Sequence, residues 1–83
     1  MMQEEEVLRK VREIVADIAE IPVEAVHGGQ SIRAHPGMDS LAVTAALVAV
    51  HKHFRIKPQR GQDVLEQLDT PEKIATFVMG QIS

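Results

Sequence analysis

Ser40 is the residue of this sequence whose surroundings most suggest chemistry. The segment Gly37-Met38-Asp39-Ser40-Leu41 carries a serine out of a glycine-containing loop and onto the expected first turn of a helix. The free N–H groups and partial positive charge of a helix N-terminus would favour a phosphodiester esterified to that hydroxyl. Serine and aspartate are also the commonest N-cap residues, so simple capping is the alternative interpretation of the same segment.

Other arrangements for catalysis or metal binding are not convincing. The sequence contains no cysteine, which excludes disulfides, thiolate metal ligands and cysteine nucleophiles. His51 and His53 are two positions apart on an expected helix and point to different faces, so we expect both to be solvated. His27 and His35 have no Asp or Glu at a recognisable ligand spacing. No base is apparent for the Ser40 hydroxyl, so we expect neither catalysis nor a bound metal.

The composition is that of one small globular domain. The 83 residues leave room for one core, so we expect residues 1–83 to form a single domain. A net charge of -3 and only two aromatic residues, both phenylalanine, argue against nucleic-acid binding. No apolar run is long enough to span a bilayer, and the start at Gln3 is acidic where a signal peptide is basic. We therefore expect a cytoplasmic, monomeric protein without membrane insertion.

Apolar periodicity predicts an all-α fold, a small bundle of three main helices plus one short helix. The first helix is expected from about residue 3 to 20, and the second from 39 or 40 to about 53 or 54. The last helix should start after Asp69 or Thr70, which can cap it, with Pro71 in its first turn. Residues 63–68 are expected to form the short helix.

A long loop is expected between the first and second helices. Residues 22–39 contain two prolines and three glycines without a sustained period, apart from a single turn at 23–26. Long structured loops are usually functional or anchored by a few apolar residues. We expect Val26 and Ile32 to be these anchors.

The segment around Ser40 resembles the modification site of acyl carrier proteins, whose Asp-Ser-Leu motif accepts 4'-phosphopantetheine on the serine. Here Asp39-Ser40-Leu41 opens the second helix. Ser31-Ile32 stands where the family has a Ser-Phe or Ser-Leu pair, Gly37 where it has its glycine, and Phe54 where its second helix ends. With the Ile-Pro-Val-Glu turn at 21–24 and the two outer helices, the resemblance covers nearly the whole chain and implies the acyl-carrier-protein-like fold.

The resemblance also implies roles for individual residues. Ser40 would be the attachment site, and Asp39 would help to bind the Mg²⁺ used by the phosphopantetheinyl transferase. Partner proteins would contact Met38, Leu41, Ala42, Ala45 and Lys52; for Leu41 the alternative is plain core packing. An acyl chain could lie between the helices against Val43, Leu47, Ile56 and Ile74, or these residues could form ordinary core.

As a carrier, the chain would hold acyl groups as thioesters on the thiol of the attached arm. Its partners would be acyl-activating, condensing or acyl-transferring enzymes of a dedicated fatty-acid, lipid or polyketide pathway. The domain itself would not be an enzyme, because activation of the serine must come from the transferase.

The second helix of this chain differs in charge from that of typical fatty-acid carriers, which have acidic residues along it. None lies between Leu41 and Phe54, and His51-Lys52-His53 replaces a common acidic cluster. Residues 1–40 carry 8 acids and 4 bases, whereas residues 41–83 carry 4 acids and 5 bases. Because electrostatic complementarity governs partner choice, we expect a specialised carrier with its own enzymes.

Two other interpretations remain open. The first is an aminoacyl, peptidyl or D-alanyl carrier protein; the segment 69–74 is similar to one of the D-alanyl carriers, although any capped helix start would share this chemistry. The second is an unmodified helical adaptor whose apolar second helix binds another protein helix. Such an adaptor would keep its function after Ser40→Ala.

Overall fold

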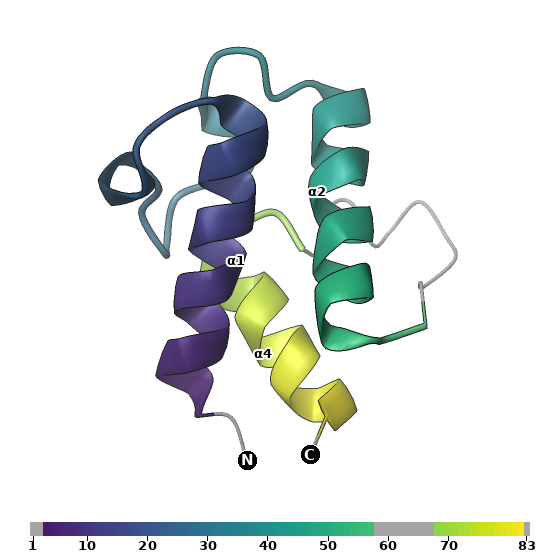
Figure 1. The fold of residues 1–83 in the computed structure, drawn as a ribbon. Helices are drawn as coiled ribbons and strands as arrows, with labels where there is room; N and C mark the ends of the chain where they lie inside the picture. Colours follow the sequence, from purple (N-terminus) through teal and green to yellow (C-terminus); the bar gives the residue numbers. More distant parts are fainter. Residues whose placement is uncertain (1–2, 58–67, 83) are drawn as a thin grey trace.

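All regular secondary structure in the described residues, 3–57 and 68–82, is helical in this computed structural model (Figure 1). The three main helices are α1 (Glu4–Ala19), α2 (Ser40–Phe54) and α4 (Pro71–Ile82). The connection between α1 and α2 contains two short 3-10 helices, η1 (Val23–Ala25) and η2 (Ile32–Ala34). The prediction of a small all-α bundle is confirmed. The short helix predicted at 63–68 lies outside the described residues, except for Leu68, which is buried.

Helix α1 forms because valines recur at helical spacing and produce one apolar stripe. Val7, Val11 and Val15 are fully buried. Three glutamates occupy its first turn, where negative charge interacts favourably with the helix dipole. The helix ends at Glu20, which adopts the left-handed conformation (φ 58°), and Pro22 then prevents its continuation.

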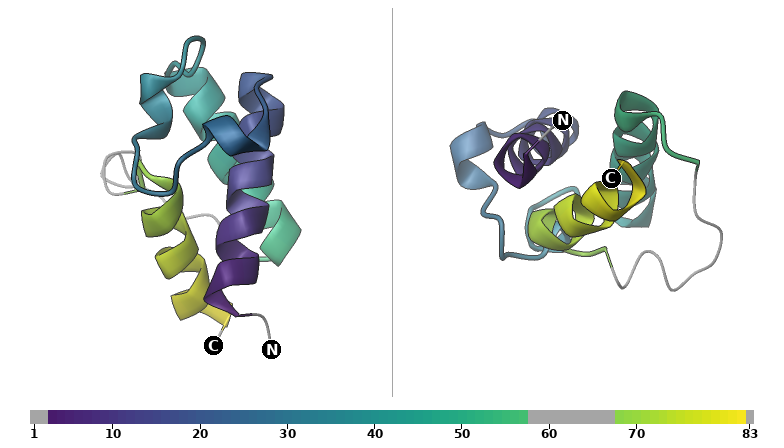
Figure 2. Two further views of the ribbon diagram at one scale, coloured as in Figure 1. Left: turned by 90° about the vertical axis from the view of Figure 1, so that its left-hand side faces the viewer. Right: turned by 90° about the horizontal axis from the view of Figure 1, so that it is seen from below.

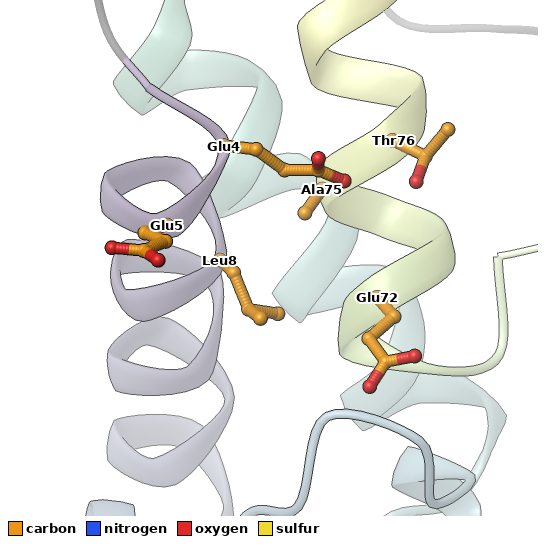
Figure 3. A pocket seen from close by; sticks show the side chains of 6 residues that line it. All are labelled: Glu4, Glu5, Leu8, Glu72, Ala75 and Thr76. Carbon is orange, nitrogen blue, oxygen red and sulfur yellow. The ribbon is translucent and has the colours of Figure 1, made fainter.

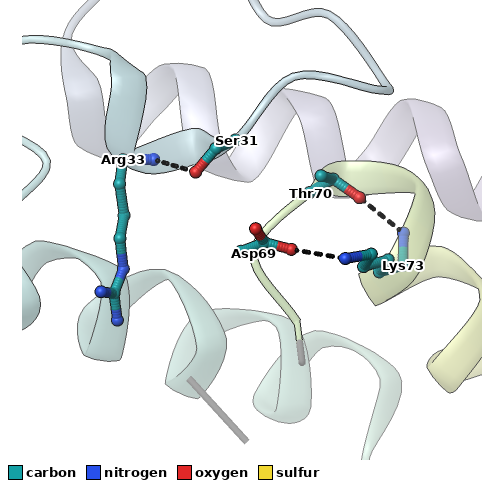
Figure 4. A network of polar contacts seen from close by, with 5 residues as sticks. All are labelled: Ser31, Arg33, Asp69, Thr70 and Lys73. Atoms are coloured by element: carbon teal, nitrogen blue, oxygen red, sulfur yellow. Dashed lines mark hydrogen bonds and ion pairs between the residues drawn. The ribbon is translucent and has the colours of Figure 1, made fainter. Parts of the chain in front are cut away.

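Capping side chains define the start of the other two main helices. Asp39 Oδ1 accepts a hydrogen bond from the Ala42 N–H at 2.9 Å at the start of α2. At the start of α4, Thr70 Oγ1 accepts from the Lys73 N–H at 3.1 Å, and Lys73 Nζ lies 3.0 Å from Asp69 Oδ1 (Figure 4). Of the two caps that the sequence allowed at each start, Asp39 and Thr70 are the ones used.

The core lies between the three helices and is almost entirely aliphatic. Helix α1 packs against both α2 and α4, and α1 and α2 run in opposite directions (Figures 1 and 2). The N-terminal end of α2 therefore lies at the opposite end of the molecule from the start of α1 and the end of α4 (Figure 1). None of the helices in this described part of the chain is long and apolar enough to cross a membrane.

Arg12 attaches the α1–α2 connection to α1. Its Nε donates to the Val26 carbonyl at 2.7 Å, and its Nη2 donates to the Val23 carbonyl at 3.1 Å. Both carbonyls belong to residues in or directly after η1. Val26 is also fully buried, as expected for an anchor of this loop.

A second set of contacts attaches the connection to the start of α4. The Ile32 N–H donates to the Asp69 carbonyl at 2.8 Å, and the Glu72 N–H donates to the Gly28 carbonyl at 3.0 Å. A Cβ at Gly28 would lie 2.8 Å from Glu72 Oε2, so glycine allows this close approach. Ile32 is fully buried, as predicted. The loop that leads to Ser40 is thus fixed to both neighbouring helices.

Candidate functional site

Ser40 is the first residue of α2 and is exposed. Its hydroxyl makes no hydrogen bond to any described residue, while its carbonyl accepts from Thr44 Oγ1 at 2.8 Å. Because the carboxylate of Asp39 serves as the N-cap, the Ser40 hydroxyl is not needed for capping. Capping in this segment is therefore done by Asp39 and not by Ser40, and modification of the Ser40 hydroxyl remains a prediction.

Gly37 and Met38 determine the path of the chain directly before Ser40. Gly37 adopts φ 84°, a conformation that favours glycine, and this turns the chain toward the start of α2. Met38 is only 5% exposed and packs into the core. Its side chain therefore anchors the loop in this structure, and the contact of Met38 with a partner protein remains a prediction.

The other expected partner contacts lie on α2. Leu41 is 81% exposed, so the alternative of core packing is wrong for this residue. Ala45 and Lys52 are also exposed, and Ala42 is half-buried. Their spacing places Leu41, Ala45 and Lys52 on the same side of the helix. Their contact with a partner remains a prediction.

The residues expected to line an acyl-chain site belong to the core. Val43 and Ile74 are fully buried, Leu47 is 5% exposed, and Ile56 is a half-buried residue packed against the same cluster. An acyl chain that reached them would have to separate packed side chains. This role also remains a prediction.

His51 is buried, so the prediction that it is solvated is wrong. It is 6% exposed, its ring centroid lies 5.8 Å from that of Phe77 in α4, and its Nδ1 is 2.6 Å from the Leu47 carbonyl. A carbonyl only accepts hydrogen bonds, so Nδ1 carries the hydrogen. Nε2 then has no partner among the described residues. His53 is exposed, as predicted.

One pocket in the described surface does not include Ser40. It has a volume of about 300 Å³, lies between α1 and α4 and is lined by Glu4, Glu5, Leu8, Glu72, Ala75 and Thr76 (Figure 3). It contains carboxylates but no histidine, and its α1 residues come from the end of the helix nearest the N-terminus. Within residues 3–57 and 68–82, no group of three or more His, Asp or Glu side chains is placed to hold a metal ion.

Comparison with known proteins identifies the class to which this bundle belongs. Residues 9–78 match the family described as the phosphopantetheine attachment site. The chain is also 31% identical over 72 residues to Acyl carrier protein 3 of Ralstonia nicotianae, an alignment that covers 87% of this chain and 80% of that protein. The chain therefore belongs to the acyl carrier protein family.

Membership of this family defines the cofactor. Its members are carrier domains that bear a covalently attached 4'-phosphopantetheine, which phosphopantetheinyl transferases install. The start of α2 fits such a group, because it presents an exposed serine, with no hydrogen bond from its hydroxyl to the residues that the structure describes, at the positive end of a helix dipole.

Proposed function

We propose that Ser40 is the attachment site of 4'-phosphopantetheine and that the chain is an acyl carrier protein of a dedicated fatty-acid, lipid or polyketide pathway. The observation that supports this most directly is the exposed Ser40 hydroxyl at the first residue of α2, inside the segment that matches the family. The bound group would supply a terminal thiol that holds acyl groups as thioesters. Tethering would raise the effective concentration of the cargo at each partner enzyme.

The residues around Ser40 support a role as a modified substrate, not as a catalyst. A serine hydroxyl is a weak nucleophile unless a neighbouring base accepts its proton. No described side chain forms a hydrogen bond to Ser40 Oγ, so the base would come from the transferase. The carboxylate of Asp39 is exposed beside it, and this supports its proposed role in binding the Mg²⁺ used by that enzyme.

The helix N-terminus would stabilise the product of modification. The phosphodiester at Ser40 would carry a negative charge beside the unpaired N–H groups of the first turn of α2. The first turn of α2 contains no acidic side chain, although the exposed carboxylate of the N-cap Asp39 lies directly before it and also carries a negative charge.

The test is the intact mass of the protein after incubation with coenzyme A, Mg²⁺ and a broad-specificity phosphopantetheinyl transferase. Wild type should gain one phosphopantetheine and Ser40→Ala none. Ser31→Ala is the matched control, because Ser31 uses its hydroxyl to accept from the Arg33 N–H at 3.2 Å, and this variant should still be modified. Addition to Ser40→Ala would contradict the proposed site. Absence of addition with every transferase tested would favour an unmodified adaptor.

The class of cargo can be tested with the modified protein. Acyl-activating ligases should load it with fatty or related acyl groups, whereas adenylating enzymes specific for amino acids should not. The similarity of residues 69–74 to D-alanyl carriers has a local explanation, since Asp69, Thr70 and Lys73 all stabilise the start of α4. Loading with an amino acid in preference to an acyl group would instead support an aminoacyl or D-alanyl carrier.

A further inference from the structure

Helix α2 is apolar on its exposed side as well as on its buried side. Its buried residues include Val43, Ala46, Leu47 and Val50. Leu41 is 81% and Val48 is 42% exposed, and they are two of the three large hydrophobic residues exposed in the described chain. A large apolar side chain that is this exposed next to a modification site is typical of an interaction surface.

The exposed apolar residues of α2 form one continuous strip. We define the outer face of α2 as the exposed residues that succeed one another at spacings of three or four, namely Leu41, Thr44, Ala45, Val48 and Lys52. Residues at these spacings are neighbours on a helix surface. The strip therefore runs along α2 from the residue after Ser40 to the last turn of the helix.

The end of this strip is basic. Lys52, His53, Arg55 and Lys57 are all exposed, and no Asp or Glu occurs from residue 40 to residue 57. In the described ranges two ion pairs are formed, Lys10–Glu13 and Lys73–Asp69, and neither involves this segment. We call residues 52, 53, 55 and 57 the basic end of α2. Its charge is not neutralised by any side chain that the structure describes.

We propose that the outer face and basic end of α2 form a docking surface for a partner protein with an apolar contact site bordered by acidic side chains. This inference rests on the proposed function for its relation to Ser40. Leu41 and Lys52 are eleven positions apart, which is about 16 Å along a helix that rises about 1.5 Å per residue. The acidic side chains of the partner would thus lie about 16 Å from the entrance that receives Ser40 and its cargo.

Complementary charge would give this surface its selectivity. Burial of Leu41 and Val48 favours association with any apolar surface, so these residues alone discriminate little between partners. Lys52 and Arg55 would attract an acidic partner and repel a basic one. These charges would therefore determine which partner binds and in which orientation. A protein partner is favoured over an anionic membrane because the chain as a whole has a net charge of -3.

The experiment uses two synthetic amphipathic helical peptides as probes. Both have leucines at spacings of four and three and differ only in four charged residues near one end, which are glutamates in one peptide and lysines in the other. They are titrated into ¹⁵N-labelled full-length Ser40→Ala protein, which cannot be modified at the proposed site. The glutamate peptide should shift the amides of α2 and bind at least tenfold more tightly than the lysine peptide, and 0.5 M salt should remove most of that preference.

Charge reversal at the basic end provides the decisive variant. Lys52→Glu/Arg55→Glu should reverse the preference between the peptides. Arg55 adopts φ 57°, and Glu20 occupies the equivalent position after α1 with φ 58°, so glutamate is compatible with this conformation. Arg9→Glu/Arg33→Glu changes the net charge equally at exposed positions outside α2 and should leave the preference unchanged. Leu41→Ala should weaken the binding of both peptides.

Several results would overturn the docking surface. These are equal binding of the two peptides, chemical shift changes on another face, or the same reversal in the Arg9→Glu/Arg33→Glu control. Stronger binding of wild type to vesicles of anionic lipid than to the glutamate peptide would also overturn it. Because the titrations use unmodifiable protein, their failure is distinguishable from failure of the proposed function, which is measured by addition of phosphopantetheine to wild type.

Discussion

At the start of α2, one residue caps the helix and the next is the proposed site of modification. Asp39 accepts the hydrogen bond from the Ala42 N–H, and this leaves the Ser40 hydroxyl without a structural task. If the order were reversed, with serine as the cap, modification would remove a hydrogen bond that holds the helix start. The observed order therefore allows Ser40 to be modified without loss of the cap.

Asp39→Asn should separate the two roles proposed for this carboxylate. Asparagine caps helices about as well as aspartate, so the free energy of unfolding should change by less than about 0.5 kcal/mol. Loss of the charge should weaken Mg²⁺ binding in the transferase complex and lower the kcat/KM of modification by about tenfold or more. Urea unfolding and the rate of mass gain measure the two effects. Asp39→Ala is the comparison, and its free energy of unfolding should also fall by about 1 kcal/mol because the cap is lost. An equal kcat/KM of modification for wild type and Asp39→Asn would refute the role of Asp39 in Mg²⁺ binding.

His51 carries a polar atom that the described core does not satisfy. A buried acceptor without a partner costs about 1–3 kcal/mol, and a leucine at this position would remove that cost. We therefore expect His51→Leu to leave the free energy of unfolding unchanged or to raise it by about 1 kcal/mol in urea denaturation. The exposed His53→Leu is the control and should change it by less than about 0.5 kcal/mol. A loss of more than about 1 kcal/mol in His51→Leu would show that the ring makes a stabilising contact.

At the scale of elements, Arg12 links α1 to the connection that leads to Ser40. Arg12→Met keeps the aliphatic stem but removes the hydrogen bonds to Val23 and Val26, and it should lower the free energy of unfolding by about 1–3 kcal/mol. Lys10→Met is the control, because its 3.5 Å ion pair with Glu13 is partly exposed and contributes less than about 1 kcal/mol. Equal effects in urea unfolding would refute the role assigned to Arg12. Hydrogen exchange at residues 23–26 should accelerate only in Arg12→Met.

The main helices could be predicted because their signals are local. Each helix boundary is marked by residues within a few positions of it. These are the proline after α1, the capping aspartate before α2 and Thr70-Pro71 at the start of α4. The hydrogen bonds that fix the α1–α2 connection join residues far apart in the sequence, such as Ile32 and Asp69, and no local pattern marks them. The single turn expected at 23–26 is η1, whereas η2, which is equally short, was not predicted.

In the candidate site, too, features that depend on neighbouring residues could be predicted, and features that depend on distant residues could not. The Asp39-Ser40-Leu41 motif and its place at a helix start were evident from the sequence, and the structure confirms that place. The burial of Met38 was not predicted, because it depends on the packing of several helices. His51 was more predictable, since it stands four positions after Leu47 and eight after Val43, on the buried side of α2.

At the scale of the whole molecule, the aliphatic core can serve as ordinary packing or as a site for the acyl chain. Val43 and Ile74 are fully buried, so a chain can enter only if the side chains packed around them separate. The core has few directional contacts to oppose such a movement, since Phe54 and Phe77 are the only aromatic residues and the buried polar residue of the described chain is His51. A longer acyl chain would gain more from entering, at about 0.8 kcal/mol per buried CH₂ group.

We therefore expect hexanoyl-loaded protein to differ from acetyl-loaded protein in its interior. Methyl groups of Val43, Leu47, Ile56 and Ile74 should shift in ¹³C NMR spectra of the hexanoyl form, and its Tm should rise relative to the acetyl form, because burial of the chain stabilises the folded state. The acetyl form is the matched control, since it has the same arm and thioester. Ile74→Phe, which fills the interior, should reduce the gain in Tm. Shift changes confined to the outer face of α2, with equal Tm values, would show that the chain stays outside and that these four residues are core alone.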